Sequence, residues 1–147
     1  MKALFLICAE GATVDQRSNT LSLFKIIEEL NISAFPSVIS AFTIAVLITR
    51  AASEPTDVND AYVRIELGNQ EIFRHPTLLR FQERNRLRII LEIGGLLIPS
   101  PGELKATLNI NGQELASWLI PVVNIGQPVV QNELSLSPIE SEQQKPY

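Results

Sequence analysis

The chain has 147 residues, 46% of them hydrophobic and 19% charged, with a net charge of −4 at pH 7. This balance excludes an intrinsically disordered chain and argues against a general nucleic-acid binder, which needs a basic surface. Cys8 is the only cysteine, so an internal disulfide and a multi-cysteine zinc site are excluded, and a reducing compartment such as the cytoplasm is expected.

Two apolar stretches are too short to be targeting or membrane segments. Residues 3–9 are followed at once by Glu10, which favours a buried strand over the core of a signal peptide. Residues 38–48 are far fewer than the roughly 20 that a membrane-spanning helix needs. We therefore expect no transmembrane segment.

The first third of the chain is predicted to be β-strands joined by polar turns. A strand over residues 3–9 precedes a polar turn over residues 15–20. Residues 21–27 have apolar spacing that suits either a helix or a strand, and we favour a strand. Residues 28–37 then form a connection, in which Pro36 keeps the preceding residue extended and prevents a helix.

The middle of the chain continues the β pattern. Residues 38–49 are β-branched and apolar almost throughout, which is typical of a central strand. A polar loop over residues 51–60 leads to residues 61–67, where apolar and polar side chains alternate. Gly68-Asn69 predicts a hairpin turn that returns through residues 70–73. The connection over residues 77–86 has room for a helical turn.

Residues 87–121 hold the densest apolar alternation and are predicted to form three antiparallel strands. The last two strands meet at Asn111-Gly112, which accepts positive φ at both positions and suits a type I′ turn. Counting outward from this turn predicts one buried apolar face containing Leu104, Leu108, Leu115 and Leu119, with these facing pairs: Ile110 and Gln113, Leu108 and Leu115, Ala106 and Ser117, and Leu104 and Leu119.

About eight short strands, separated by Gly, Pro and Asn turns, predict an all-β fold. We expect an antiparallel β-sandwich, C2-like or immunoglobulin-like, with a partly open barrel as the alternative. A single domain is predicted over residues 1–131. A short edge strand is expected within residues 122–130, and residues 132–147, with few apolar residues, have the composition of a disordered tail.

The segment LICAEGATVDQRSNTLSLFKIIEELNISAFPS combines a hydrophobic strand, a polar turn, a second strand and the Phe35-Pro36 step into a long apolar strand. In this order it resembles an uncharacterised family of small bacterial proteins whose domain has no assigned function. The resemblance covers the first half of the chain. It implies a bacterial all-β domain and assigns no catalytic residue.

Three features are candidates for catalysis or metal binding. His75 is the only histidine, so a small hydrolase would have to use it, but a histidine before proline is more often a turn residue. Cys8 lies in an apolar run and is predicted to be a core residue. The polar loop carries oxygen ligands suited to calcium but without the glycine of a helix-loop-helix site, so a solvated loop is favoured; these ligands are Glu54, Asp57, Asn59 and Asp60.

The strongest charge feature is a segment of arginines accompanied by a single acid, Glu83. The guanidinium group suits phosphate and carboxylate partners, so this segment is a candidate anion-binding surface. We favour the alternative, a solvated segment that pairs with acids elsewhere in the chain. No phosphate-binding loop accompanies it, because Gly94-Gly95 lies within a strand pattern and reads as a bulge. The candidate residues are Arg74, Arg80, Arg84, Arg86 and Arg88.

A large apolar core without a convergent titratable cluster predicts a non-enzymatic interaction or accessory module whose partner is another protein. The alternative is a module that binds phosphate or nucleic acid through residues 74–88, and a small hydrolase comes third. Nucleic acid is the less expected partner because the chain is acidic. No sequence motif for a cofactor or a metal is present.

Overall fold

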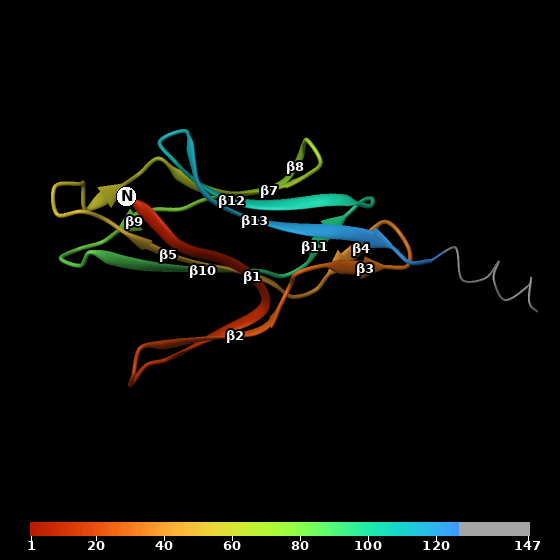
Figure 1. Cartoon of the computed structure of the whole chain (residues 1–147), viewed down its shortest axis with the longest axis horizontal. Helices are drawn as coiled ribbons and strands as arrows, with labels where there is room; N and C mark the ends of the chain where they lie inside the picture. Colours follow the sequence, from red (N-terminus) through yellow and green to blue (C-terminus); the bar gives the residue numbers. More distant parts are fainter. Residues whose placement is uncertain (127–147) are drawn as a thin grey trace, which may run out of the picture.

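The computed structural model describes residues 1–126 and consists of β-strands packed as a sandwich (Figure 1). Eight strands have seven or more residues, which confirms the expected all-β sandwich of about eight strands. They are β1 (Lys2–Asp15), β2 (Thr20–Ile26), β5 (Phe42–Thr49), β7 (Ala61–Leu67), β8 (Gln70–Pro76), β10 (Arg86–Ile93), β12 (Gly102–Ile110) and β13 (Gln113–Asn124). The five short ones are β3 (Leu30–Ile32), β4 (Ser37–Ile39), β6 (Asp57–Val58), β9 (Leu79–Arg80) and β11 (Leu96–Ile98).

Two sheets form the layers. Sheet A has four strands in the order β10-β5-β1-β2, and sheet B has five strands in the order β3-β13-β12-β7-β8. All neighbours are antiparallel except β3 and β13, which are parallel. Two small ribbons, β4 with β11 and β6 with β9, complete the structure. The strands β7, β8, β12 and β13 of sheet B lie above sheet A in Figure 1.

One hydrophobic cluster fills the space between the sheets. Alternate residues of each strand supply it, because successive side chains of a strand point to opposite faces. In β7 the buried residues are Val63, Ile65 and Leu67, as the alternation predicts. In β5 both faces are largely buried, as expected for a central strand. No helix within residues 1–126 is long and apolar enough to cross a membrane.

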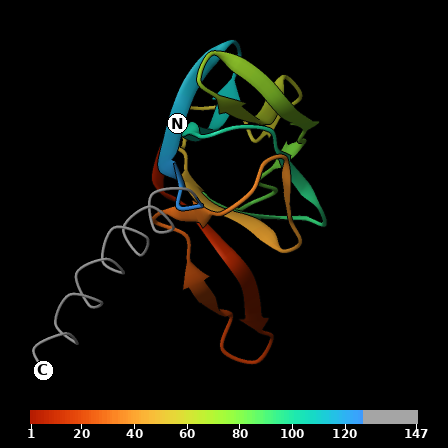
Figure 2. The same cartoon turned by 90° about the vertical axis from the view of Figure 1, so that its right-hand side faces the viewer.

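Strand β1 pairs with two strands and is longer than the predicted strand over residues 3–9. Its first half pairs with β5, and its second half pairs with β2, with Ala9 facing residues of both. The outer part of β1 and the whole of β2 therefore form a hairpin that projects from the body of the sandwich (Figure 2). The ambiguous run over residues 21–27 is thus mainly a strand, as favoured.

The Asn111-Gly112 turn is confirmed, but the predicted register beyond it is wrong. Both turn residues have positive φ, 52° and 80°, and Ile110 faces Gln113 as expected. A β-bulge between Leu108 and Asn109 then shifts the pairing by one residue, so that Leu108 faces Ala116 and Leu104 faces Ile120. Leu119 consequently points outward and is 49% exposed.

Four smaller expectations also change. The predicted strand over residues 38–49 is interrupted at Ser40, and its two parts, β4 and β5, pair in different sheets. Gly94-Gly95 is not a bulge within a strand but the link between β10 and β11, with Gly95 at φ +94°. The 77–86 connection contains β9 and no helix. β8 continues through Pro76.

At the end of the described chain, residues 122–124 belong to β13 and pair with β3. They are therefore the end of a long internal strand of sheet B, not a separate edge strand. The rest of that predicted strand and the expected tail over residues 132–147 lie outside the described residues.

Candidate functional site

Four of the five candidate arginines line one open groove at an end of the sandwich. The groove has a volume of about 870 Å³. Its lining comes from β9, the loop that follows it, β10, the adjoining strand β5 and the tip of the β1–β2 hairpin. The lining residues are Asn19, Leu47, Arg80, Phe81, Gln82, Arg84, Asn85, Arg86, Leu87 and Arg88. We call this feature the arginine groove.

The loop between β9 and β10 is held in place by buried anchors. Leu79 is fully buried and Phe81 is 1% exposed. The backbone N–H of Phe81 donates to the carbonyl of Thr56 at 2.8 Å. The loop then reverses at Gln82, whose φ is 57°, and the N–H of Arg84 donates back to the carbonyl of Phe81 at 3.0 Å. These contacts present Arg80 and Arg84 at the surface while the side chains of Leu79 and Phe81 stay inside.

Arg50 fastens the same loop to sheet A. Its Nε donates to the carbonyl of Arg84 at 3.2 Å, and its backbone N–H donates to the carbonyl of Asn85 at 2.9 Å. The guanidinium carbon lies 5.7 Å from the centre of the Phe81 ring, within reach of a cation–π contact. Arg50 was missed by sequence reasoning. Its position directly after a strand gives no local sign of a partner more than thirty residues away.

Strand β10 supplies the other two arginines. Leu87 and Ile89 pack against the core, so Arg86 and Arg88, which alternate with them, point to the outer face of sheet A. Arg88 donates from Nη1 to Oδ1 of Asn19 at 3.1 Å and from Nη2 to its carbonyl at 3.0 Å. This contact ties the tip of the projecting hairpin to the groove.

The four arginines differ in whether an acid already neutralises them. Arg80 forms an ion pair with Asp57 at 3.1 Å, and both side chains are about half exposed, so solvent screens this pair. Within residues 1–126, neither Arg84 nor Arg86 makes an ion pair with an acidic side chain. Their charges are available to a ligand.

Arg74 does not belong to the groove, so the structure separates it from the other predicted residues. It lies on β8, in the other sheet, where Nη2 and Nε are 2.9 and 3.0 Å from Oε1 of Glu71. The guanidinium carbon lies 4.0 Å from the centre of the Tyr62 ring. The hydrogen bond with Glu71 raises the pKa of Arg74 above its ordinary value. These partners occupy the Arg74 side chain.

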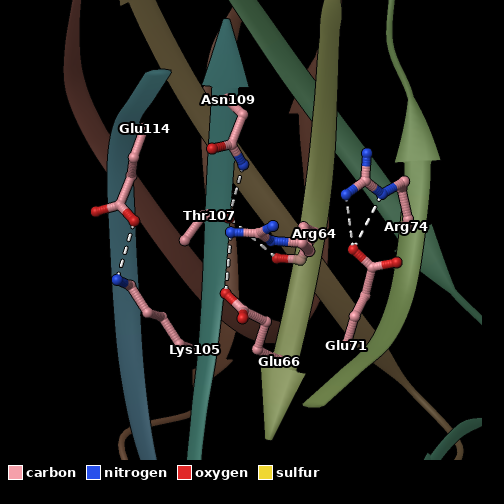
Figure 3. Close-up of polar contacts among 8 residues, drawn as sticks. All are labelled: Arg64, Glu66, Glu71, Arg74, Lys105, Thr107, Asn109 and Glu114. Atoms are coloured by element: carbon pink, nitrogen blue, oxygen red, sulfur yellow. Dashed lines mark hydrogen bonds and ion pairs between the residues drawn. The ribbon is translucent and has the colours of Figure 1, made fainter. Parts of the chain in front are cut away.

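Arg74 is part of a second polar cluster on the outer face of sheet B (Figure 3). There Arg64 pairs with Glu66 at 3.1 Å and Lys105 with Glu114 at 2.9 Å. Because each of these three cations has an acid beside it, the cluster offers no net charge to an anion.

His75 and Cys8 lie in different sheets, His75 on β8 of sheet B and Cys8 on β1 of sheet A. His75 is exposed on β8, where its ring stacks on Phe73 with 6.5 Å between centroids. No described hydrogen bond joins His75 to a serine or a carboxylate. Cys8 is fully buried, and burial raises the pKa of its thiol to about 12. A thiol in this state is a poor nucleophile.

Two acids of the 51–60 loop, Glu54 and Asp57, already have partners in the protein. Asp57 pairs with Arg80, and Glu54 accepts from the amino terminus and from the N–H of Ala51. The bond with the amino terminus is the largest cause that lowers the pKa of Glu54. Residues 1–126 contain no group of three or more His, Cys, Asp or Glu side chains that could hold a metal ion.

The sequence matches a described protein family over residues 4–123, well beyond the first half of the chain in which the resemblance was seen. The chain belongs to the family of unknown function DUF6941. No curated protein matches it. Because DUF6941 has no assigned activity, its name transfers no role to the arginine groove, and the function must be argued from the groove itself.

Proposed function

We propose that the protein is a non-enzymatic interaction module that binds an acidic segment of another protein in the arginine groove. The observation that carries this proposal is that four arginines line one groove, and three of them, Arg84, Arg86 and Arg88, make no ion pair with an acid among residues 1–126. Carboxylates are suited to such a site, because the planar guanidinium donates two parallel hydrogen bonds to a carboxylate.

A protein partner is favoured over nucleic acid for two reasons. The net charge of −4 repels a long polyanion, whereas a short acidic segment meets only the local positive charge. Single-stranded nucleic acid is commonly bound by stacking its bases on aromatic side chains. The aromatic side chain that lines the groove, Phe81, is 1% exposed and cannot present its face to a base.

The absence of enzymatic activity is also a proposal. The exposed position of His75 on β8 and the burial of Cys8 support it, because a nucleophile and its base need to lie within hydrogen-bonding distance. We further propose a bacterial cytoplasmic setting, in which a free buried thiol such as Cys8 stays reduced.

The experiment is a binding measurement with a fluorescent peptide rich in Asp and Glu, at low and at physiological salt. The double variant Arg80→Glu, Arg84→Glu should bind at least about tenfold more weakly than the wild type, because opposed charges become like charges. A matched control, Lys25→Glu with Arg74→Glu, makes the same change in net charge away from the groove and should bind like the wild type.

Two results would contradict the proposal. Equal peptide binding by the wild type and the groove variant at low salt, where screening is weak, would show that the arginines do not hold the ligand. The second is tighter binding of a single-stranded oligonucleotide than of the peptide, with an affinity that falls steeply as the salt concentration rises. This result would show that the groove binds phosphate groups of nucleic acid instead.

A further inference from the structure

Among the residues that the structure describes, strand β10 forms a long, regular sheet edge that pairs with no other strand on its outer side. All eight of its residues, from Arg86 to Ile93, pair with β5 without a register shift. β10 is the last strand of sheet A on that side, and within residues 1–126 no element other than β5 forms a backbone hydrogen bond with it. In any strand, alternate N–H and C=O groups point away from the neighbour, so this edge offers unpaired groups to another strand.

The other three sheet edges carry features that oppose pairing. Strand β8 is irregular, with a register shift opposite Glu66 and a terminal Pro76 that cannot donate. Strand β2 has Lys25 in the left-handed region, with φ 54°, which breaks the extended backbone. Strand β3 has only three residues. Natural proteins commonly protect edges in these ways, and β10 has none of these features.

The β10 sequence, RLRIILEI, has a basic residue near its start and an acidic residue near its end, so two antiparallel copies place opposite charges side by side. Its inward side chains are all apolar and pack against the core. The outer face of the strand has Arg86 at one end and Glu92 at the other. Within residues 1–126 neither side chain is engaged in an ion pair.

We propose that two copies of the chain form a dimer by antiparallel pairing of their β10 edges, with the two-fold axis at Ile89. In this register Arg86 of each copy faces Glu92 of the other, which gives two ion pairs by symmetry. Leu87 faces Leu91 on the inner side, and Arg88 faces Ile90 on the outer side. Residues on the same face of the sheet meet, as antiparallel pairing requires.

The neighbouring registers fit less well. A shift of two residues in one direction places Arg88 opposite Arg88 of the other copy, and like charges directly opposite each other are destabilising. A shift in the other direction places Arg88 opposite Glu92, but Arg88 already donates both of its terminal nitrogens to Asn19. The register centred on Ile89 is therefore the one that uses the charges free in the monomer.

The dimer would join two four-stranded copies of sheet A into one continuous sheet. Because the strands run antiparallel, the two arginine grooves would lie at opposite ends of the junction. This inference goes beyond the proposed function, with which it shares Arg86. The pairing with Glu92 would use the Arg86 guanidinium and would leave Arg80 and Arg84, which lie outside β10, to the acidic segment.

Sedimentation equilibrium over the micromolar range tests the dimer. The wild type should have twice the chain mass of 16.3 kDa. Arg86→Glu and Glu92→Arg should each weaken association by about tenfold or more, because both symmetric pairs become repulsive. The double variant Arg86→Glu, Glu92→Arg restores opposite charges and should associate like the wild type. Arg84→Glu, with the same charge change outside β10, should leave the dimer unchanged.

Circular dichroism melting of each variant separates lost association from lost folding, and the double variant provides a second check because it must both fold and dimerise. A wild type that is monomeric throughout the range would overturn the proposal. A dimer that persists in both single variants, or that the double variant fails to restore, would equally overturn it by locating the contact elsewhere.

Discussion

Thr107 and Asn109 are polar residues on the outer face of sheet B, and both are nevertheless buried. They satisfy each other, since Nδ2 of Asn109 donates to Oγ1 of Thr107 at 2.9 Å (Figure 3). The hydroxyl of Thr107 also lies 3.5 Å from the carbonyl of Arg64. Buried polar groups need such partners, because an unmade hydrogen bond costs more than a made one contributes. Among the buried side-chain nitrogen and oxygen atoms of residues 1–126, only Nε of Arg64 lacks a hydrogen-bond partner.

The Cys8 thiol is predicted to be unreactive in the native protein. Its full burial and its raised pKa of about 12 keep the thiol protonated and out of reach of reagents. We expect almost no reaction with a chromogenic disulfide reagent at pH 8 in the native protein and complete reaction after unfolding in guanidinium chloride. Cys8→Ser should give no signal in either condition. Rapid labelling of the native protein would mean that β1 opens readily or that Cys8 is not in the core.

At the scale of elements, the β12–β13 hairpin shows what the sequence could and could not reveal. The turn was readable because Asn-Gly is chemically suited to positive φ. The register was not, because β13 reads as an alternating strand in either phase: Leu115, Ser117 and Leu119 alternate as plausibly as Ala116, Trp118 and Ile120. The bulge at Leu108 selects the second phase. No residue pattern near Leu108 predicts this bulge.

The hairpin register can be tested by paired truncations. Leu108→Ala should lower the free energy of unfolding by about 2 to 5 kcal/mol, because Leu108 is fully buried. Leu119→Ala should cost less than about 0.5 kcal/mol, because Leu119 points outward and is half exposed. Urea denaturation of both variants measures the difference. Similar losses for the two would show that the bulge is absent and that the register follows simple alternation.

The sequence predicted four of the five arginines to belong together correctly and the fifth, Arg74, wrongly. Arg80, Arg84, Arg86 and Arg88 lie close in sequence on β9, its loop and β10, so local chain direction was enough to bring them together. Arg74 is as near in sequence, but β8 belongs to sheet B while β10 belongs to sheet A. Which sheet a strand joins depends on contacts between distant residues, and single-sequence patterns do not carry that information.

At the scale of the whole molecule, the two sheets share one hydrophobic cluster that contains Cys8 of sheet A and Leu108 of sheet B. Trp118, the only tryptophan, packs against the same cluster from β13. Its Nε1 donates to the carbonyl of Ile27, just beyond β2, at 2.8 Å. This bond joins a strand of sheet B to the end of the projecting hairpin. The sheets therefore depend on the same contacts for stability.

A shared core predicts that the sheets unfold together, which also tests the expected single domain over residues 1–131. Trp118 fluorescence reports on sheet B, and the reactivity of the Cys8 thiol reports on sheet A. Both should follow the same urea transition as far-UV circular dichroism, because a cooperative domain loses all its packing at once. The measurements must share one protein concentration, since a dimer would raise the midpoint as concentration rises. Exposure of Cys8 at a clearly lower urea concentration than the change in Trp118 would show that sheet A unfolds separately.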